Sequence, residues 1–213
     1  MLHVRSLVFN PFQENTYVVW DDDGDCAIID PGCSNAEENQ ELQNFITEHQ
    51  LKVRRLLNTH CHIDHVLGNR FVSETWAVKL EIPEKEQEVL KSAEVLGPAY
   101  GFHDYRHQNA DVFLKEGDVV QVGDLAFTVL FVPGHSPGHV AFYDKDNETL
   151  FGGDVLFYNS IGRTDLPGGH HETLISSIHH KLFSLPDATK VYPGHGPATT
   201  IGFEKRTNPF LRN

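Results

Sequence analysis

The sequence predicts an α/β fold in which two β-sheets are sandwiched by helices. Short apolar strand patterns come in consecutive runs, and helical patterns separate these runs rather than following every strand. The 213 residues contain no internal repeat, no low-complexity segment and no linker rich in proline, glycine or serine. We therefore expect one domain over residues 1–213.

The first third of the chain predicts three strands, a helix and a fourth strand. The first three strands are expected at residues 4–9, 15–20 and 26–29, separated by turn-rich segments. Ser34, with Glu37 three residues later, forms a capping-box pattern that predicts a helix beginning at Ser34. Residues 53–57 have the pattern of a buried strand that leads into a histidine-rich segment, and residues 66–77 fit a helix.

Residues 83–109 differ in composition from their surroundings. A charged helical run over 84–96 is followed by Gly97-Pro98, which predicts a break, and then by aromatic and polar residues. This pattern is typical of a lid over a site, and the alternative is a surface excursion. Tyr100 and His103 are the candidates in this segment for contact with a substrate.

The second half of the chain predicts further strands and a helix. Strands are expected at residues 112–114, 119–122, 125–132, 140–143 and 149–151, with a short one around Val191. Apolar residues at helical spacing, from Leu174 to Leu182, predict a helix over 172–183. Together with the N-terminal strands, these strands supply the two predicted sheets.

The charge balance excludes some classes of function. Lys and Arg number 17 against 30 Asp and Glu, which gives a net charge of −13. An acidic body repels phosphate backbones, so we expect no nucleic-acid partner. No apolar run approaches the roughly 20 residues needed to cross a bilayer, and the N-terminus lacks the apolar core of a secretion signal. We therefore expect a cytoplasmic protein with no membrane partner, and nothing in the sequence indicates its oligomeric state.

Histidine and aspartate follow predicted strands in four short segments. These segments are His60-x-His62-x-Asp64-His65, Pro133-Gly134-His135, Gly152-Gly153-Asp154 and Pro193-Gly194-His195. If the first segment is extended, alternation places His60, His62 and Asp64 on one side, while His65 continues around a turn. The glycines in the other three segments let the backbone turn sharply beside a crowded centre. A lone histidine is usually a core or surface residue, but the full set predicts metal ligands.

The ligand types indicate the metal and its chemistry. Imidazole and carboxylate without cysteine suit zinc, with iron and manganese as alternatives. Two divalent ions can share the ligands if Asp154 bridges them. Site one is then His60, His62, His135 and Asp154, and site two is Asp64, His65, His195 and Asp154. Ions ~3.5–4 Å apart activate a shared hydroxide and stabilise the oxyanion formed by its attack. The sequence therefore predicts a metal-dependent hydrolase with Asp64 and Asp154 as catalytic residues.

Two residues near the predicted ligands have other expected roles. His139 lies at the start of a predicted strand, so we expect it to pack or to support the ligands rather than to bind metal. Cys61 points away from its histidine neighbours by alternation and is expected to be a buried structural thiol. The three cysteines show no paired spacing, which argues against a disulfide framework.

The order and spacing of the predicted ligands resemble those of the metallo-beta-lactamase superfamily. The resemblance rests on the His60–His65 motif followed by His135, Asp154 and His195. It implies an αββα sandwich of two mixed sheets flanked by helices, with the metals at one edge between the sheets. True beta-lactamases of the superfamily typically have cysteine where Asp154 stands, which disfavours that activity. Nuclease members usually need additional domains or a basic surface, and this acidic chain shows neither.

Within the superfamily, the chain resembles the short bacterial members of the glyoxalase II group. The similar segments are residues 10–17, 153–157, 161–165 and 208–210. The resemblance implies a small-molecule substrate, a hydroxyacyl thioester such as S-lactoylglutathione, that is hydrolysed to a hydroxy acid and a thiol. The group has a glutathione-binding lysine and an aromatic residue where this chain has Arg163 and Asp165. Arg163 can pair with a substrate carboxylate or form a structural ion pair with Asp165.

Two other functions are consistent with the same residues. Residues 162–165 also resemble a segment of persulfide dioxygenases, which hold one iron with two histidines and a carboxylate, here His60, His135 and Asp154. The third possibility is a non-catalytic metal-binding module. The identity and number of the bound metal ions distinguish these functions.

Overall fold

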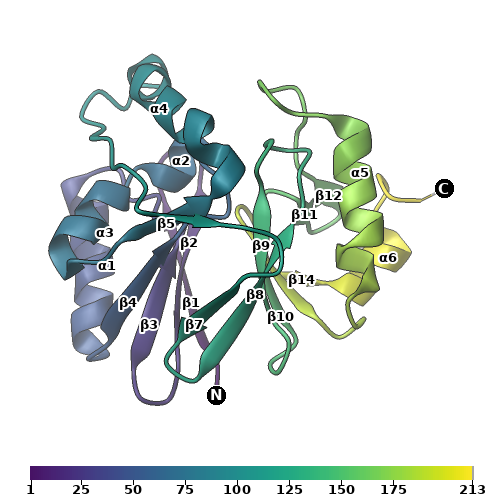
Figure 1. Ribbon diagram of the computed structural model, residues 1–213, viewed down its shortest axis with the longest axis horizontal. Helices are drawn as coiled ribbons and strands as arrows, with labels where there is room; N and C mark the ends of the chain where they lie inside the picture. Colours follow the sequence, from purple (N-terminus) through teal and green to yellow (C-terminus); the bar gives the residue numbers. More distant parts are fainter. Residues whose placement is uncertain (213) are drawn as a thin grey trace. The chain divides into compact units, whose positions relative to one another are not determined.

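The computed structural model describes residues 1–212, which form two compact units. Unit one contains residues 1–114 and 121–125, and unit two contains residues 115–120 and those from 126 onward. Each unit has β-strands and helices of its own (Figure 1). One domain over residues 1–213 stays a prediction.

The sheet of unit one has six strands in chain order, β1-β2-β3-β4-β5-β6. Their bounds are β1 (His3–Phe9), β2 (Glu14–Trp20), β3 (Asp25–Ile29), β4 (Lys52–Leu57), β5 (Leu80–Pro83) and β6 (Val112–Leu114). The β1/β2 and β2/β3 pairs are antiparallel, and the pairs from β3 to β6 are parallel, so the sheet is mixed. In a parallel pair the carboxyl ends of the strands lie at the same edge, which brings the residues after β3 close to those after β4.

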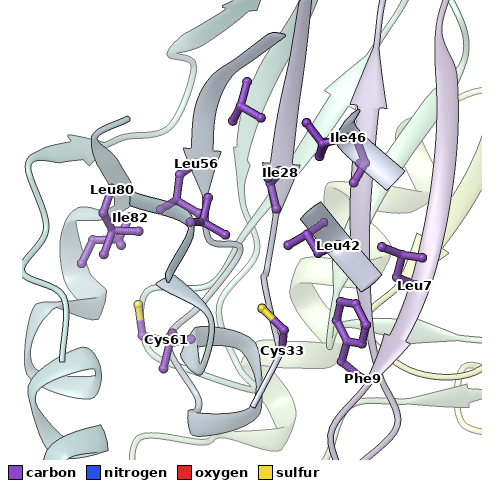
Figure 2. Packing of buried hydrophobic residues seen from close by; sticks show 14 of the residues in the cluster. Leu7, Phe9, Ile28, Cys33, Leu42, Ile46, Leu56, Cys61, Leu80 and Ile82 are labelled. Carbon is purple, nitrogen blue, oxygen red and sulfur yellow. The ribbon is translucent and has the colours of Figure 1, made fainter. Parts of the chain in front are cut away.

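The helices of unit one follow its strands. They are α1 (Ala36–Glu48), α2 (Ile63–Val66), α3 (Asn69–Trp76), the 3-10 turn η1 (Glu84–Glu86) and α4 (Gln87–Ala99). Leu42 and Ile46 from α1 share one apolar core with residues of the sheet such as Ile28 (Figure 2). Cys33 and Cys61 lie in the same core, and burial raises the pKa of both thiols. Cys61 is therefore the buried thiol that the sequence predicted.

The second sheet has the strand order β14-β13-β10-β9-β8-β7. Its strands are β7 (Val119–Val122), β8 (Leu125–Phe131), β9 (Val140–Asp144), β10 (Thr149–Gly153), β13 (Lys190–Pro193) and β14 (Thr199–Thr200). The β10/β13 pair is parallel and its neighbours are antiparallel, so this sheet is also mixed. A small hairpin, β11 (Leu156–Phe157) with β12 (Ser160–Ile161), follows β10.

The helices of unit two cover an apolar core of their own. They are α5 (His171–His180), the 3-10 turn η2 (Leu182–Ser184) and α6 (Ile201–Thr207). Leu174 and Ile178 of α5 pack in one cluster with Leu150 and Val191 of the sheet. The predicted helical spacing over 172–183 is confirmed, although the α-helix itself ends at His180.

The start of α1 and the end of α4 differ from the expectation. The N-cap of α1 is Asn35, whose Oδ1 accepts hydrogen bonds from the N–H groups of Glu37 and Glu38, both at 3.0 Å. Ser34 instead donates to the Glu38 carboxylate through its N–H and hydroxyl groups, so the helix begins after Asn35. Helix α4 continues through Gly97-Pro98 to Ala99, and Gly97 packs against Tyr105.

The helix expected over residues 66–77 is divided into α2 and α3. Gly68 lies between them as the N-cap of α3, and only glycine fits there because a Cβ would lie 2.3 Å from Cys33 Sγ and 2.9 Å from the Pro31 carbonyl oxygen. Strand β5 was missed in the sequence, as were β11, β12, β14 and α6. Within residues 1–212, no helix combines the length and the apolarity that crossing a membrane requires.

Candidate metal centre

The first predicted ligand segment leaves β4 and enters α2. His62 is the N-cap of α2, with φ −64° and ψ 152°, so the chain is extended up to His62 and helical from Ile63 onward. The expectation that Asp64 continues the alternation of an extended segment is therefore wrong. Asp64 and His65 lie on a turn of helix, where the carboxylate Oδ2 is 3.7 Å from His65 Nε2.

A buried aspartate that we did not predict, Asp30, orients two of the histidines. Its Oδ2 lies 3.2 Å from His65 Nδ1 and accepts the Thr59 hydroxyl proton at 2.6 Å. With its proton directed at Asp30, Thr59 Oγ1 accepts from His60 Nδ1 at 3.1 Å. Both imidazoles therefore carry their proton on Nδ1 and present Nε2 as a lone pair, which is the form that binds metal.

Asp30 itself could be counted as a ligand. One ligand atom from each of Asp30, His60 and His65 lies within 4.8 Å of the others, and all three residues are buried. However, the carboxylate of Asp30 also accepts the Thr59 N–H at 2.7 Å, in addition to the two bonds above. These bonds direct its oxygens toward the protein, so we assign Asp30 to the support of the ligands. The signal that could have revealed it is a carboxylate directly after β3, beside the parallel strand β4.

A second buried carboxylate lies on the same side of His65. Glu14 is fully buried on β2, with Oε1 3.9 Å from His65 Nδ1 and Oε2 accepting from Thr16 Oγ1 at 2.8 Å. Desolvation by burial raises the pKa of the Glu14 carboxyl well above its usual range. A Cβ on Gly32 would lie 2.1 Å from Glu14 Oε2 and 2.6 Å from the Asp64 carbonyl oxygen, so only glycine fits between them.

Asn10 fixes the backbone of Asp64. Its Nδ2 donates to the carbonyl oxygens of Gly32 and Asp64, both at 3.0 Å, and its Oδ1 accepts from the Phe12 N–H at 3.0 Å. The φ of Asn10 is +52°, a left-handed conformation that asparagine tolerates better than most residues. The loop after β1 is therefore fastened to the turn that carries Asp64.

The remaining predicted ligands gather in unit two. Asp154 Oδ2 lies 3.6 Å from His135 Nε2 and 3.5 Å from His195 Nε2. These separations exceed a hydrogen bond. Donor atoms at about 2.0–2.1 Å from one tetrahedral ion are about 3.3–3.4 Å apart, so the separations match ligands that share a metal. Each of the two carboxylate–imidazole pairs thus fits a divalent ion bound by both members of the pair.

Residues around Asp154 hold this group in place. His135 Nδ1 lies 2.8 Å from the carbonyl oxygen of Arg163, which accepts its proton and leaves Nε2 for a metal. The Asp154 N–H donates to His139 Nε2 at 3.0 Å, so His139 holds the backbone of a predicted ligand, which is the supporting position expected for it. A Cβ on Gly162 would lie only 1.9 Å from the Asp154 carbonyl oxygen. The sequence could not indicate the Arg163 contact, because it uses a backbone atom.

The predicted substrate residues lie on the surface of their units. The Arg163 guanidinium forms two hydrogen bonds of 2.7 Å with the Asp165 carboxylate, and this pair lowers the pKa of Asp165 to about 2. Tyr100 and His103 are exposed in unit one, at and just after the end of α4. Their contact with a substrate stays a prediction, as does the closing of residues 83–109 over a site.

Comparison with known proteins identifies the family. Residues 9–195 match the model of the metallo-beta-lactamase superfamily. The chain belongs to this superfamily. As a metallo-beta-lactamase superfamily member it is a metal-dependent hydrolase, and its histidine and aspartate groups imply divalent metal ions.

Three relatives show how far the likeness extends. Hydroxyacylglutathione hydrolase GloC of Haemophilus influenzae is 39% identical, and the alignment covers 100% of this chain and 99% of GloC. The BLEG-1 B3 metallo-beta-lactamase structure is 37% identical with a TM-score of 0.87 and 100% coverage of both chains. A structure of TTHA1623 in a di-iron-bound form is 39% identical with a TM-score of 0.87, covering 98% of this chain and 100% of that one. The expected fold class is thereby confirmed.

Proposed function

We propose that this superfamily member hydrolyses thioesters of the hydroxyacylglutathione type at a centre of two divalent metal ions. The observation that carries the proposal is the position of Asp154 Oδ2, which lies within 3.6 Å of the Nε2 atoms of both His135 and His195. One carboxylate beside two imidazoles is the arrangement expected of a ligand shared between ions. The full-length similarity to GloC supports the thioester class.

We assign the ligands as the sequence suggests. Site one takes His60, His62, His135 and Asp154, and site two takes Asp64, His65, His195 and Asp154. Zinc is the expected metal because the ligands are imidazole and carboxylate. When bound, such ions would supply a water of lowered pKa and an electrophilic contact for the thioester carbonyl.

The side chains of the protein have distinct tasks in this proposal. Asp30 and the Arg163 carbonyl hold imidazole protons on Nδ1, so the Nε2 atoms remain lone pairs throughout the reaction. The carboxylates of Asp64 and Asp154 accept hydrogen bonds from the attacking water and fix its direction. Water adds to the carbonyl carbon, the C–S bond breaks, and the products are a carboxylic acid and a thiol. A thiol with a pKa of roughly 8.5 leaves as the thiolate without a general acid.

Substrate binding involves the three candidates from the sequence. The side chains of Arg163 and Asp165 are 61% and 67% exposed. Because a solvent-exposed ion pair contributes little to stability, a substrate carboxylate can displace Asp165 from Arg163 at small cost in free energy. We propose that Arg163 binds a carboxylate of the thiol half of the substrate. Tyr100 and His103 are proposed to contact the acyl half.

The test is hydrolysis of S-lactoylglutathione by protein whose metal content is known. Loss of thioester absorbance with about two metal ions per chain is the expected result. Asp154→Ala should abolish both turnover and metal retention, and His179→Ala, whose half-buried ring on α5 packs against Phe183, should change neither. A beta-lactam serves as the alternative substrate, since BLEG-1 is described as a beta-lactamase. Hydrolysis of the lactam but not of the thioester would refute the proposal.

A second function depends on iron as the native metal. A structure of TTHA1623, 39% identical to this chain, is of a di-iron-bound form, which supports iron as a candidate metal here without favouring a single-ion centre. In a persulfide dioxygenase, His60, His135 and Asp154 would hold a single iron. Iron-loaded protein that consumes oxygen with glutathione persulfide, contains one iron per chain and leaves S-lactoylglutathione intact would establish this function instead.

A further inference from the structure

Unit one displays a group of aromatic side chains on its surface. Phe12 is 44% exposed and Tyr100 is 49% exposed, although large apolar side chains are usually covered. The ring of Phe12 lies 5.9 Å from that of Tyr100 at 80°, and 5.9 Å from that of Phe102 at 46°. We call these three residues the aromatic cluster. Leu96, one helical turn before Tyr100 on α4, is also 40% exposed.

The aromatic cluster is tied to the turn that carries Asp64 from two directions. Asn10 Oδ1 accepts from the Phe12 N–H, and Asn10 Nδ2 donates to the Asp64 carbonyl oxygen, each at 3.0 Å. From the other side, Gly97 near the end of α4 packs against Ile63, the residue before Asp64. A Cβ built on Gly97 would lie 3.5 Å from Ile63 Cδ1. The two segments that carry the cluster therefore both contact the turn of a proposed metal ligand, Asp64.

The turn that presents Phe12 is already formed. The Gln13 N–H donates to the Asn10 carbonyl oxygen at 3.0 Å, and both residues have positive φ values, +57° and +52°. Pro11 restricts the backbone between them. A ring held in this way loses little freedom when a ligand packs on it, so the exposed face of Phe12 is suited to binding.

The apolar character of the aromatic cluster suits the acyl half of a thioester better than the thiol half. Its rings offer an apolar surface without a charged side chain, and the glutathione half of the proposed substrate is charged. The acyl half is apolar except for its hydroxyl group. An aromatic acyl group gains more from such a surface than a methyl-bearing lactoyl group, because aromatic rings pack on one another in edge and offset geometries.

We propose that the aromatic cluster binds the acyl substituent of the thioester and gives the enzyme a preference for large apolar or aromatic hydroxyacyl groups. This inference rests on the proposed thioesterase function. Phe12 is then a determinant of substrate specificity, and Tyr100 contacts the acyl substituent as part of the same cluster.

The test compares kcat/KM for S-mandeloylglutathione and S-lactoylglutathione, which differ only in the acyl substituent. Phe12→Ala is expected to lower the mandeloyl-to-lactoyl ratio about three- to tenfold, the contribution of an aromatic pair. Phe12→Leu should lower it less. Phe113→Ala is the matched control, since Phe113 on β6 is 41% exposed and lies outside the cluster. Thermal unfolding of each variant shows whether it is folded.

The outcomes separate the two proposals. An unchanged ratio in Phe12→Ala, or an equal loss with both substrates, would overturn the acyl-binding role, while lactoyl hydrolysis by the wild-type protein would leave the thioesterase proposal standing. If the wild-type protein hydrolyses neither thioester, the proposed function fails and the specificity proposal fails with it.

Discussion

Replacing Asp30 by asparagine tests how the ligand histidines are oriented. The substitution keeps the shape of the side chain and replaces one carboxylate oxygen by an NH₂ group. If this group takes the place of Oδ2, it faces His65 Nδ1 and Thr59 Oγ1 as a donor, which moves the imidazole protons of His65 and His60 to Nε2. If it takes the place of Oδ1, it meets the Thr59 N–H, which is 2.7 Å from that oxygen in the native protein.

Both arrangements carry a similar penalty. A buried donor facing another donor costs about 1–3 kcal/mol. Imidazoles protonated on Nε2 must move that proton before they can bind metal. Loss of a residue that orients a ligand typically weakens metal binding 10–100-fold, or about 1.4–2.7 kcal/mol. We therefore expect Asp30→Asn to raise the dissociation constant for zinc by about one to two orders of magnitude.

The assay is a competition titration of zinc against a chromophoric chelator, with unfolding in urea measured in parallel. Asp21→Asn is the matched control, because Asp21 is also 2% exposed and accepts backbone hydrogen bonds in unit one without contacting a predicted ligand. A zinc affinity equal to that of the wild-type protein, or an equal loss in the Asp21 variant, would refute the role of Asp30.

Three further outcomes are expected. Asp154→Ala should lose the shared ligand oxygen and therefore both bound metal ions, as measured by elemental analysis after dialysis; one ion retained at full occupancy would contradict the bridging role. Gly162→Ala should destabilise the fold by more than about 2 kcal/mol in urea, because its Cβ would lie 1.9 Å from the Asp154 carbonyl oxygen, whereas at Gly152 the nearest atom is 3.5 Å away and alanine should be tolerated. The depressed pKa of Asp165 means that its ion pair with Arg163 stabilises the folded state above the ordinary value of 3.8 and is lost as pH falls through about 2. A carbon NMR titration should therefore place the Asp165 midpoint near 2 in the wild-type protein and closer to 3.8 in Arg163→Ala, and an equal midpoint in both would exclude the ion pair as the cause.

The predicted ligands could be recognised from the sequence because each motif is local. His60 to His65 fall within six residues, and glycines mark the positions of His135, Asp154 and His195. The residues that orient them were not recognisable in the same way. Asp30 acts on Thr59, 29 residues further along the chain and brought close by the pairing of β3 with β4, and a lone aspartate after a strand is common.

The fold was predictable where strands were long enough to show alternation. Strand β5 escaped because Glu81 interrupts its apolar pattern; the structure shows that Glu81 is 3% exposed and pairs with Arg55 at 2.8 Å, a partner that the local sequence does not reveal. Strands of two residues, such as β11 and β14, are too short for a periodic signal. The start of α2 at Ile63 was missed because the metal-ligand pattern fits both an extended segment and a helical turn.

The three cysteines of this chain all lie before residue 62, within unit one, and none is in unit two. Each is buried, and burial raises the pKa of the Cys26 thiol to about 12. A thiol reagent therefore reacts with the native protein only when unit one opens. The rate of labelling measures local opening of this unit alone, and the number of thiols modified in each molecule tells whether β3 opens together with the segments that hold Cys33 and Cys61. The native cysteines thus report the stability of unit one against local opening, and no probe has to be introduced.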